Sequence, residues 1–225
     1  MCGRRVYPHH AMVIAIDGPA GAGKSTVARG AADALGFTYL DSGAMYRCLA
    51  LMALRTGAEL DDEEGLGDLA RAIVGAIEFG DGKVLIEGID VTQEIREPDV
   101  SAVASQVSVH PQVRKAMVTR QRELIDAGRY VAEGRDIGTV VSPDAPLKVF
   151  LTASDEERAR RRAAETGEPL EAVRHAIRNR DERDIEREHG ALRPAEDAVQ
   201  MDTTELSVAE IVERVVDLAT ERGLA

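Results

Sequence analysis

The sequence predicts an α/β fold in which helices cover both faces of a parallel β-sheet. Short apolar runs rich in β-forming residues recur along the chain, and helical patterns separate them. The runs occupy residues 12–17, 37–40, 129–133, 147–152 and 198–202. Right-handed crossovers place the carboxyl ends of such strands along one edge, so we expect the ligand site at that edge.

The size and charge of the chain limit its organisation and its partners. With 225 residues it can form one core with modest insertions, so we expect a single domain over residues 1–225. The 40 acidic residues outnumber the 28 lysines and arginines, and the net charge of −12 disfavours nucleic acid and anionic membranes as partners. Neither a signal peptide nor an apolar run of about 18 residues is evident. We therefore expect a cytoplasmic monomer.

The first strand, residues 12–17, leads directly into the sequence GPAGAGKS at residues 18–25. This sequence fits the pattern G-x-x-x-x-G-K-[ST], and its position between a strand and a helix predicts a phosphate-binding loop. Glycines let backbone N–H groups surround a phosphate, Lys24 reaches the β and γ oxygens, and Ser25 ligates Mg²⁺. A dinucleotide-binding loop is disfavoured because no G-x-G-x-x-G can be read here, and the guanine-reading N-K-x-D motif of GTPases is missing.

The second strand, residues 37–40, precedes a helix that carries Arg47, and the alternation of strands and helices then breaks. A turn signal at residues 81–82 lies between two β-like runs within residues 77–96, which predicts an antiparallel hairpin. We take residues 57–110 as a small insertion on the main sheet.

The third strand, residues 129–133, ends just before Arg135 and Asp136, which lie between two glycines. A charged pair at the carboxyl edge of a buried strand is more typical of a functional site than of a solvated surface. Arg135 is therefore a candidate for contact with an anion.

The fourth strand, residues 147–152, precedes an arginine-rich segment that we interpret as a lid over residues 154–180. Ser154 and Glu157 have capping-box spacing, which predicts a helix that begins there. The arginines on one side of this helix would be Arg158, Arg161 and Arg162. Farther on, Arg180, Asp184 and Arg187 have the spacing of one helix face, although a solvated helix laced with ion pairs explains that spacing as well.

A phosphoryl acceptor could be a hydroxyl or another phosphate. A hydroxyl must lose a proton, whereas a phosphate with a second pKa of about 6 is already mostly ionised at neutral pH and needs charge neutralisation instead. The chain is rich in arginine at strand ends, which favours a phosphate acceptor. Two alternatives remain open: a kinase for a small hydroxyl metabolite with Asp41 as the base, and a non-enzymatic ATP-binding module.

Six motifs together resemble the bacterial cytidylate kinases over nearly the whole chain from Met12 onward. The motifs are IDGPAGAGKST, LDSGAMYR, ASQVSVHPQVR, EGRDIGTVVSPDAPLKVFLTAS, RNRDERD and MDTTELS. The resemblance implies a P-loop kinase fold with a five-stranded parallel sheet in the order 2-3-1-4-5, a CMP-side insertion and a lid. It implies transfer of the γ-phosphoryl group of Mg·ATP to CMP or dCMP, in pyrimidine metabolism.

The same resemblance implies a role for each matching residue. ATP would be held by Gly18, Pro19, Ala20, Gly21, Ala22, Gly23, Lys24, Ser25 and Thr26, and by the lid residues Arg158 and Arg161. The phosphate of CMP would be clamped by Arg47, Arg135 and Arg187, with Ser42 and Tyr46 lining the same pocket. Cytosine would be read by Ser105, Arg114 and Asp136, and the sugar would be held by Arg180 and Asp184. Lys24 and the three phosphate-clamping arginines would form the catalytic set.

The proposed cytosine readers fit the chemistry of the base. Cytosine has an amino donor at N4 that Asp136 can accept, and Arg114 can donate to the acceptors on the ring edge. Uracil would place O4 against Asp136, so two acceptors would face each other. At about 1–3 kcal/mol for an unsatisfied buried group, this favours cytosine roughly 5- to 150-fold.

Overall fold

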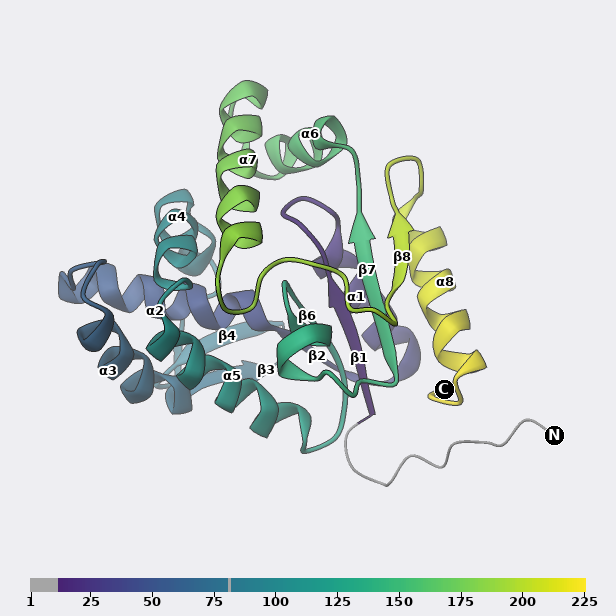
Figure 1. Ribbon diagram of the computed structural model, residues 1–225, viewed down its shortest axis with the longest axis horizontal. Coiled ribbons are helices and arrows are strands. Elements are labelled where there is room, and N and C mark those ends of the chain that lie inside the picture. Colours follow the sequence, from purple (N-terminus) through teal and green to yellow (C-terminus); the bar gives the residue numbers. More distant parts are fainter. Residues whose placement is uncertain (1–11, 81) are drawn as a thin grey trace.

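The computed structural model describes residues 12–80 and 82–225 of the chain (Figure 1). Asp81, the first residue of the expected hairpin turn, lies outside the described residues. Strands are β1 Met12–Asp17, β2 Thr38–Asp41, β3 Ile77–Gly80, β4 Lys83–Ile86, β5 Ile89–Asp90, β6 Arg129–Gly134, β7 Leu147–Thr152 and β8 Val199–Asp202. Helices are α1 Lys24–Leu35, α2 Ser42–Thr56, α3 Glu63–Ile73, α4 Pro98–Val107, α5 Pro111–Ile125, α6 Asp155–Thr166, α7 Leu170–Glu186 and α8 Val208–Glu221. Short 3₁₀ turns occupy Val74–Ala76 and Glu94–Arg96, and Ile137–Val141 forms a single π-helical turn.

The main sheet has five strands in the order β2-β6-β1-β7-β8, and every pair in it is parallel. Numbered along the chain without the three insertion strands, this is the order 2-3-1-4-5, so the expected fold class and strand order are confirmed. The apolar runs placed all five strands within one residue at each end, because continuous buried strands leave a clear signal in sequence.

Both faces of this sheet are covered, and β1 shows how. Ile14 and Ile16 pack with Val27 of α1 and Val215 of α8 on one face. The alternate residues Val13 and Ala15 point to the other face, toward α5 and the π-helical turn. The α6–α7 pair stands at the end of the sheet to which the arrowhead of β7 points (Figure 1).

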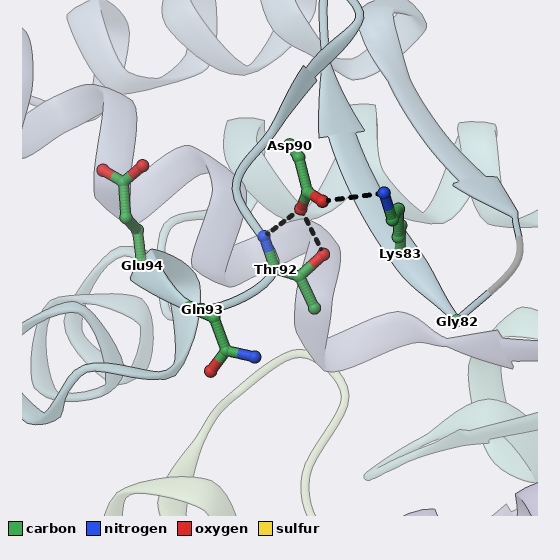
Figure 2. Close-up of a pocket in the computed structure, with 6 residues that line it drawn as sticks. All are labelled: Gly82, Lys83, Asp90, Thr92, Gln93 and Glu94. Atoms are coloured by element: carbon green, nitrogen blue, oxygen red, sulfur yellow. Dashed lines mark hydrogen bonds and ion pairs between the residues drawn. The ribbon is translucent and has the colours of Figure 1, made fainter.

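The predicted hairpin is present, and it has a third strand. β3 pairs antiparallel with β4, and β4 pairs antiparallel with β5. A hollow of about 500 Å³ beside β4 and β5 is lined by Gly82, Lys83, Asp90, Thr92, Gln93 and Glu94 (Figure 2). This set contains none of the predicted site residues. In the described part of the chain, no helix is long and apolar enough to cross a membrane.

Candidate active site

The phosphate-binding loop, residues 18–25, connects the end of β1 to α1. Gly18 has φ 151° and its Cα faces the carbonyl of Leu151 so closely that a side chain would collide with it. Gly23 has φ 84° and lies at the N-terminal end of α1, where free backbone N–H groups and the helix dipole favour an anion. The loop is therefore shaped by its glycines as the motif predicts.

Lys24 is buried at the start of α1, and its Nζ donates to the carbonyl of Pro19 at 2.8 Å. Burial, together with the positive charges of Arg135 and Arg180, lowers the pKa of Lys24 to about 7. Glu133 opposes this shift. The lysine side chain is thus held among other cations, where an incoming polyphosphate would relieve the repulsion.

Glu133, at the carboxyl end of β6, is a site residue that the sequence analysis did not assign. Burial is the main cause that raises its pKa, and hydrogen bonds from Ser25 and Tyr39 oppose the rise. The Tyr39 hydroxyl donates to Glu133 at 2.6 Å. The glutamate therefore lies beside both Ser25 and Lys24. Its place at the end of the strand next to β1 was the signal that could have identified it.

Asp17 and Asp41 are the last residues of two strands at the same edge of the sheet, and both carboxylates accept hydrogen bonds from backbone N–H groups. Asp17 accepts from the backbone N–H groups of Ile137 at 2.8 Å and Gly138 at 2.7 Å, which fastens the π-helical turn to the end of β1. Burial raises the pKa of Asp17 to about 6, although the two amides oppose the shift. Asp41 caps α2 by accepting from the N–H of Ala44 at 2.9 Å.

Four arginines from three segments converge near the loop. Arg47 pairs with Asp41 at 2.7 Å, and the Nε of Arg135 donates to Asp184 at 2.8 Å. Arg187 lies 3.5 Å from the other carboxylate oxygen of Asp184. The fourth is Arg180. Its burial and the charges of Arg135, Arg47 and Arg162 lower its pKa to about 9, with Asp184 opposing the shift.

The expected placement of Arg187 on a helix face is wrong in one respect. α7 ends at Glu186, and Arg187 is the first residue after it, in an extended conformation with ψ 132°. The side chain still reaches Asp184, because the chain turns back over the end of the helix; the N–H of Leu192 donates to the carbonyl of Asp184 at 2.7 Å.

Several buried donors near this cluster have no hydrogen-bond partner among the described residues. They are Nε of Arg47, Nε of Arg180, Nε and Nη2 of Arg187, and the hydroxyl of Ser105. Buried polar groups in proteins are nearly always satisfied, so donors left open together in one region indicate the place of a polar ligand.

A second buried pair, Arg114 of α5 and Asp136, lies beside the arginine cluster. The two side chains are hydrogen-bonded and almost inaccessible to solvent. Tyr46 lies close to both: burial raises its pKa to about 12, Asp136 adds to the rise, and Arg114 opposes it. Gly190, with φ 70°, covers the pair, and any side chain there would collide with Arg114 and Asp136. Sequence reasoning missed Gly190 because nothing in its neighbours marks the contact.

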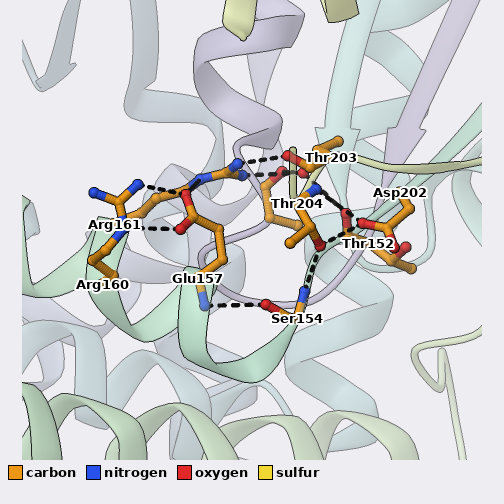
Figure 3. Close-up of polar contacts among 9 residues, drawn as sticks. Thr152, Ser154, Glu157, Arg160, Arg161, Asp202, Thr203 and Thr204 are labelled. Carbon is orange, nitrogen blue, oxygen red and sulfur yellow. Dashed lines mark hydrogen bonds and ion pairs between the residues drawn. The ribbon is translucent and has the colours of Figure 1, made fainter. Parts of the chain in front are cut away.

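The three arginines of the predicted lid lie on one side of α6, as their i, i+3 and i+4 spacing requires, but they have different partners. Arg158 is buried against Asp181 of α7, whereas Arg162 pairs with Glu165 at 3.1 Å. Arg161 donates to the hydroxyl of Thr203 at 3.0 Å and to its carbonyl at 2.6 Å (Figure 3).

The helix begins at Asp155, where Ser154 accepts from the N–H of Glu157 at 3.3 Å. The Glu157 carboxylate completes no capping box, because it pairs with Arg160 and Arg161 (Figure 3). These two contacts, Arg160 first, lower the pKa of Glu157 to about 2.

Comparison with known proteins identifies the family. A family model described as cytidylate kinase matches residues 14–221. The cytidylate kinase of Stutzerimonas stutzeri (strain A1501) is 50% identical over 222 residues, which cover 95% of this chain and 97% of the relative. The cytidylate kinase of Geobacillus kaustophilus (strain HTA426) is 50% identical over 218 residues, with coverage of 93% and 96%.

A crystal structure of an uncharacterized protein from Eubacterium ventriosum ATCC 27560 has a similar fold, with a TM-score of 0.54 and 12% identity over 94% of this chain and 99% of that one. At this identity the similarity shows only the fold. The family model and the two relatives establish the family as well, since they match nearly the full length of the chain. The chain belongs to the cytidylate kinase family.

Proposed function

We propose that this protein transfers the γ-phosphoryl group of ATP to CMP or dCMP, giving ADP and CDP or dCDP. The observation that carries the proposal is the meeting of Arg47, Arg135 and Arg187 with Lys24 at one edge of the sheet, with several of their buried donors unpartnered. Two anionic phosphates can meet in line only where such charges neutralise them.

The donor nucleotide would occupy the phosphate-binding loop, from Gly18 to Thr26, with Arg161 beside it. The guanidinium of Arg161 lies next to Gly23, and its hydrogen bonds to Thr203 hold it there before ATP arrives. Lys24 would exchange its bond to the Pro19 carbonyl for the β and γ oxygens of ATP. The positive charges that lower the pKa of this lysine would then be matched by phosphate.

Residues near Ser25 fit a magnesium ion. The Ser25 hydroxyl and the Glu133 carboxylate lie together, and hard oxygen groups of this kind are what Mg²⁺ takes, together with water and phosphate. When bound with ATP, the ion neutralises charge on the β and γ oxygens. No cluster of three or more His, Cys, Asp or Glu side chains that could hold a metal occurs among the described residues, so phosphate oxygens would complete the coordination.

The acceptor would lie across from the loop. We propose that Arg47, Arg135 and Arg187 clamp its phosphate, with Ser42 and Tyr46 in the wall of the pocket. Ser105, Arg114 and Asp136 would read cytosine, and Arg180 and Asp184 would bind the sugar. The open hydroxyl of Ser105 and the open Nε of Arg180 are the donors such a nucleotide would satisfy.

Catalysis would consist of positioning and charge neutralisation. The acceptor phosphate carries its own negative charge, so no side chain has to remove a proton. Asp41 is poorly placed to be the base that a hydroxyl acceptor would need, because it caps α2 and is paired with Arg47. The hydroxyl-kinase alternative is therefore not favoured.

The organisation of the chain fits this reaction. We propose that residues 57–110 form the CMP-side insertion and that residues 154–180 form the lid. We also propose that the enzyme works as a monomer in the cytoplasm, where its free nucleotide substrates are found.

An assay of ADP release with a panel of acceptors tests the proposal. The panel consists of CMP, dCMP, UMP, AMP and shikimate, each with ATP and Mg²⁺. We expect kcat/KM to be highest for CMP and dCMP. Faster turnover of shikimate would support the hydroxyl-kinase alternative, and ATP binding without any acceptor-dependent turnover would support a non-enzymatic binding module.

A further inference from the structure

A buried ion pair connects the two lid helices to the phosphate-binding loop. Arg158 of α6 and Asp181 of α7 are only 7% and 8% exposed, and Nη1 of the arginine donates to the aspartate. Buried charges of this kind are retained only where each has partners, and removing one of them leaves the other uncompensated. The third partner of the pair is the backbone of Ala20 in the loop.

Ala20 is held by both polar groups of its backbone and by its methyl group. Its N–H donates to Asp181 at 3.3 Å, and its carbonyl accepts from Arg158 at 3.0 Å. The methyl group packs against the small apolar cluster that joins α6 and α7, formed by Ala159, Val173 and Ile177.

The next residue shows that helix and loop fit closely. Gly21 has φ 75°, and a Cβ built on it would lie 2.7 Å from the carbonyl oxygen of Arg158 and 3.0 Å from its Cβ. Backbone cannot move aside for a side chain in such a contact. The first turn of α6 is therefore seated directly on the loop at residues 20–21.

We propose that Arg158 and Asp181 are positioning residues for the donor nucleotide, which act on the loop through Ala20 and do not contact ATP themselves. The N–H of Ala20 is engaged by Asp181, so the phosphates are left to the N–H groups that follow it and to Lys24. A loop held in its binding shape in advance loses less conformational freedom when ATP binds, and so binds ATP more tightly. This assignment replaces the direct contact between Arg158 and ATP that the family resemblance implies.

The chain contains a matched control at Asp155. This aspartate pairs with the same guanidinium, through Nη2 at 2.6 Å, but its side chain is 64% exposed. Asp155→Asn removes a negative charge that pairs with Arg158, and it leaves both hydrogen bonds of Ala20 in place. Exposed ion pairs contribute little to stability. This variant therefore shows what happens when Arg158 loses an ion-pair partner that does not contact the loop.

The experiment compares wild type, Asp181→Ala, Asp181→Asn and Asp155→Asn. ATP is varied at saturating CMP, CMP is varied at saturating ATP, and the Kd of Mg·ATP is measured by calorimetry without acceptor. We expect Asp181→Ala to raise the KM and the Kd for ATP by about tenfold, as the loss of a hydrogen bond to a charged group suggests. Asp181→Asn should have a smaller effect, since its carbonyl can still accept from Ala20. The KM for CMP, and all constants of Asp155→Asn, should change less than about twofold.

Two outcomes would overturn the inference. The first is an unchanged affinity for ATP in Asp181→Ala. The second is a rise in the KM for CMP as large as that for ATP, or the same loss of ATP affinity in Asp155→Asn; either result would mean that the ion pair has only a structural role. Thermal melting checks that each variant folds. If Asp181→Ala does not fold, Arg158→Lys is used instead. Lysine keeps the positive charge but cannot bridge Asp181 and Ala20 as the guanidinium does. We expect the same loss of affinity for ATP, with the KM for CMP unchanged. The inference rests on ATP as the donor, which the turnover of the wild type with CMP tests separately.

Discussion

Lys24→Met should make the protein more stable at pH 7 in the absence of nucleotide, although it should abolish phosphoryl transfer. The pKa of Lys24 falls from 10.5 to about 7 in the folded protein. At about 1.4 kcal/mol per pKa unit, keeping this ammonium group in its site costs about 4 kcal/mol at neutral pH. Methionine has a similar length and removes the charge.

Part of this gain is lost because Lys24 also donates to the Pro19 carbonyl. Leaving that acceptor unsatisfied costs about 1–3 kcal/mol, so the net gain should be about 1–3 kcal/mol. With an unfolding entropy of about 2.1 cal/mol/K per residue, the melting temperature should rise by about 2–6 °C.

The sign of the pH dependence gives a sharper test. Between pH 7 and 10.5 the unfolded chain keeps the lysine proton that the folded protein has released, so the stability of the wild type rises with pH. The advantage of Lys24→Met should therefore shrink by about 2 kcal/mol from pH 7 to pH 9.

Thermal unfolding followed by circular dichroism at pH 7, 8 and 9 measures this change. Lys83→Met is the control, because the Lys83 side chain is 60% exposed on the antiparallel sheet and its replacement should show neither effect. A Lys24→Met protein less stable than wild type at pH 7, or an advantage that does not vary with pH, would refute the reasoning.

Three further predictions concern the acceptor. Asp136→Ala should reduce the preference for CMP over UMP by roughly 5- to 150-fold in kcat/KM, because the partner of the cytosine amino group is removed; equal losses with both acceptors would contradict this role. Arg135→Ala should lower kcat by about 100-fold or more, since it removes a positive charge that would clamp the acceptor phosphate and neutralise the transition state; a change in KM alone would argue against a transition-state contact. Gly190→Val should raise the KM for CMP by about tenfold with the KM for ATP unchanged, because a side chain there would displace Arg114 and Asp136. An unchanged KM for CMP would show that the loop carrying Gly190 moves freely.

The sequence predicted the elements whose signal is local. The main strands, their parallel arrangement and the hairpin follow from apolar runs and turn residues, and the loop of Gly23 and Lys24 follows from a motif that specifies its own backbone shape. The third insertion strand, Ile89–Asp90, has only two residues and leaves too short a pattern to be recognised.

Partners that are distant in sequence could not be predicted in the same way. Arg158, Arg161 and Arg162 are close in sequence and all are cationic, yet one is buried against α7, one is held by Thr203 and one is partly exposed and pairs with Glu165. Which of these environments an arginine receives depends on how α6 and α7 pack. Gly190 was missed for the same reason, since its neighbour Arg114 comes from α5.

The contact between Asp17 and the amides of Ile137 and Gly138 has a geometric consequence. Asp17 is followed directly by Gly18, so one peptide bond joins the residue whose carboxylate anchors the π-helical turn to the first residue of the phosphate-binding loop. The spacing between the phosphate-binding loop and the π-helical turn is therefore fixed at one point of the backbone. That spacing is built into the tip of β1, the central strand of the sheet.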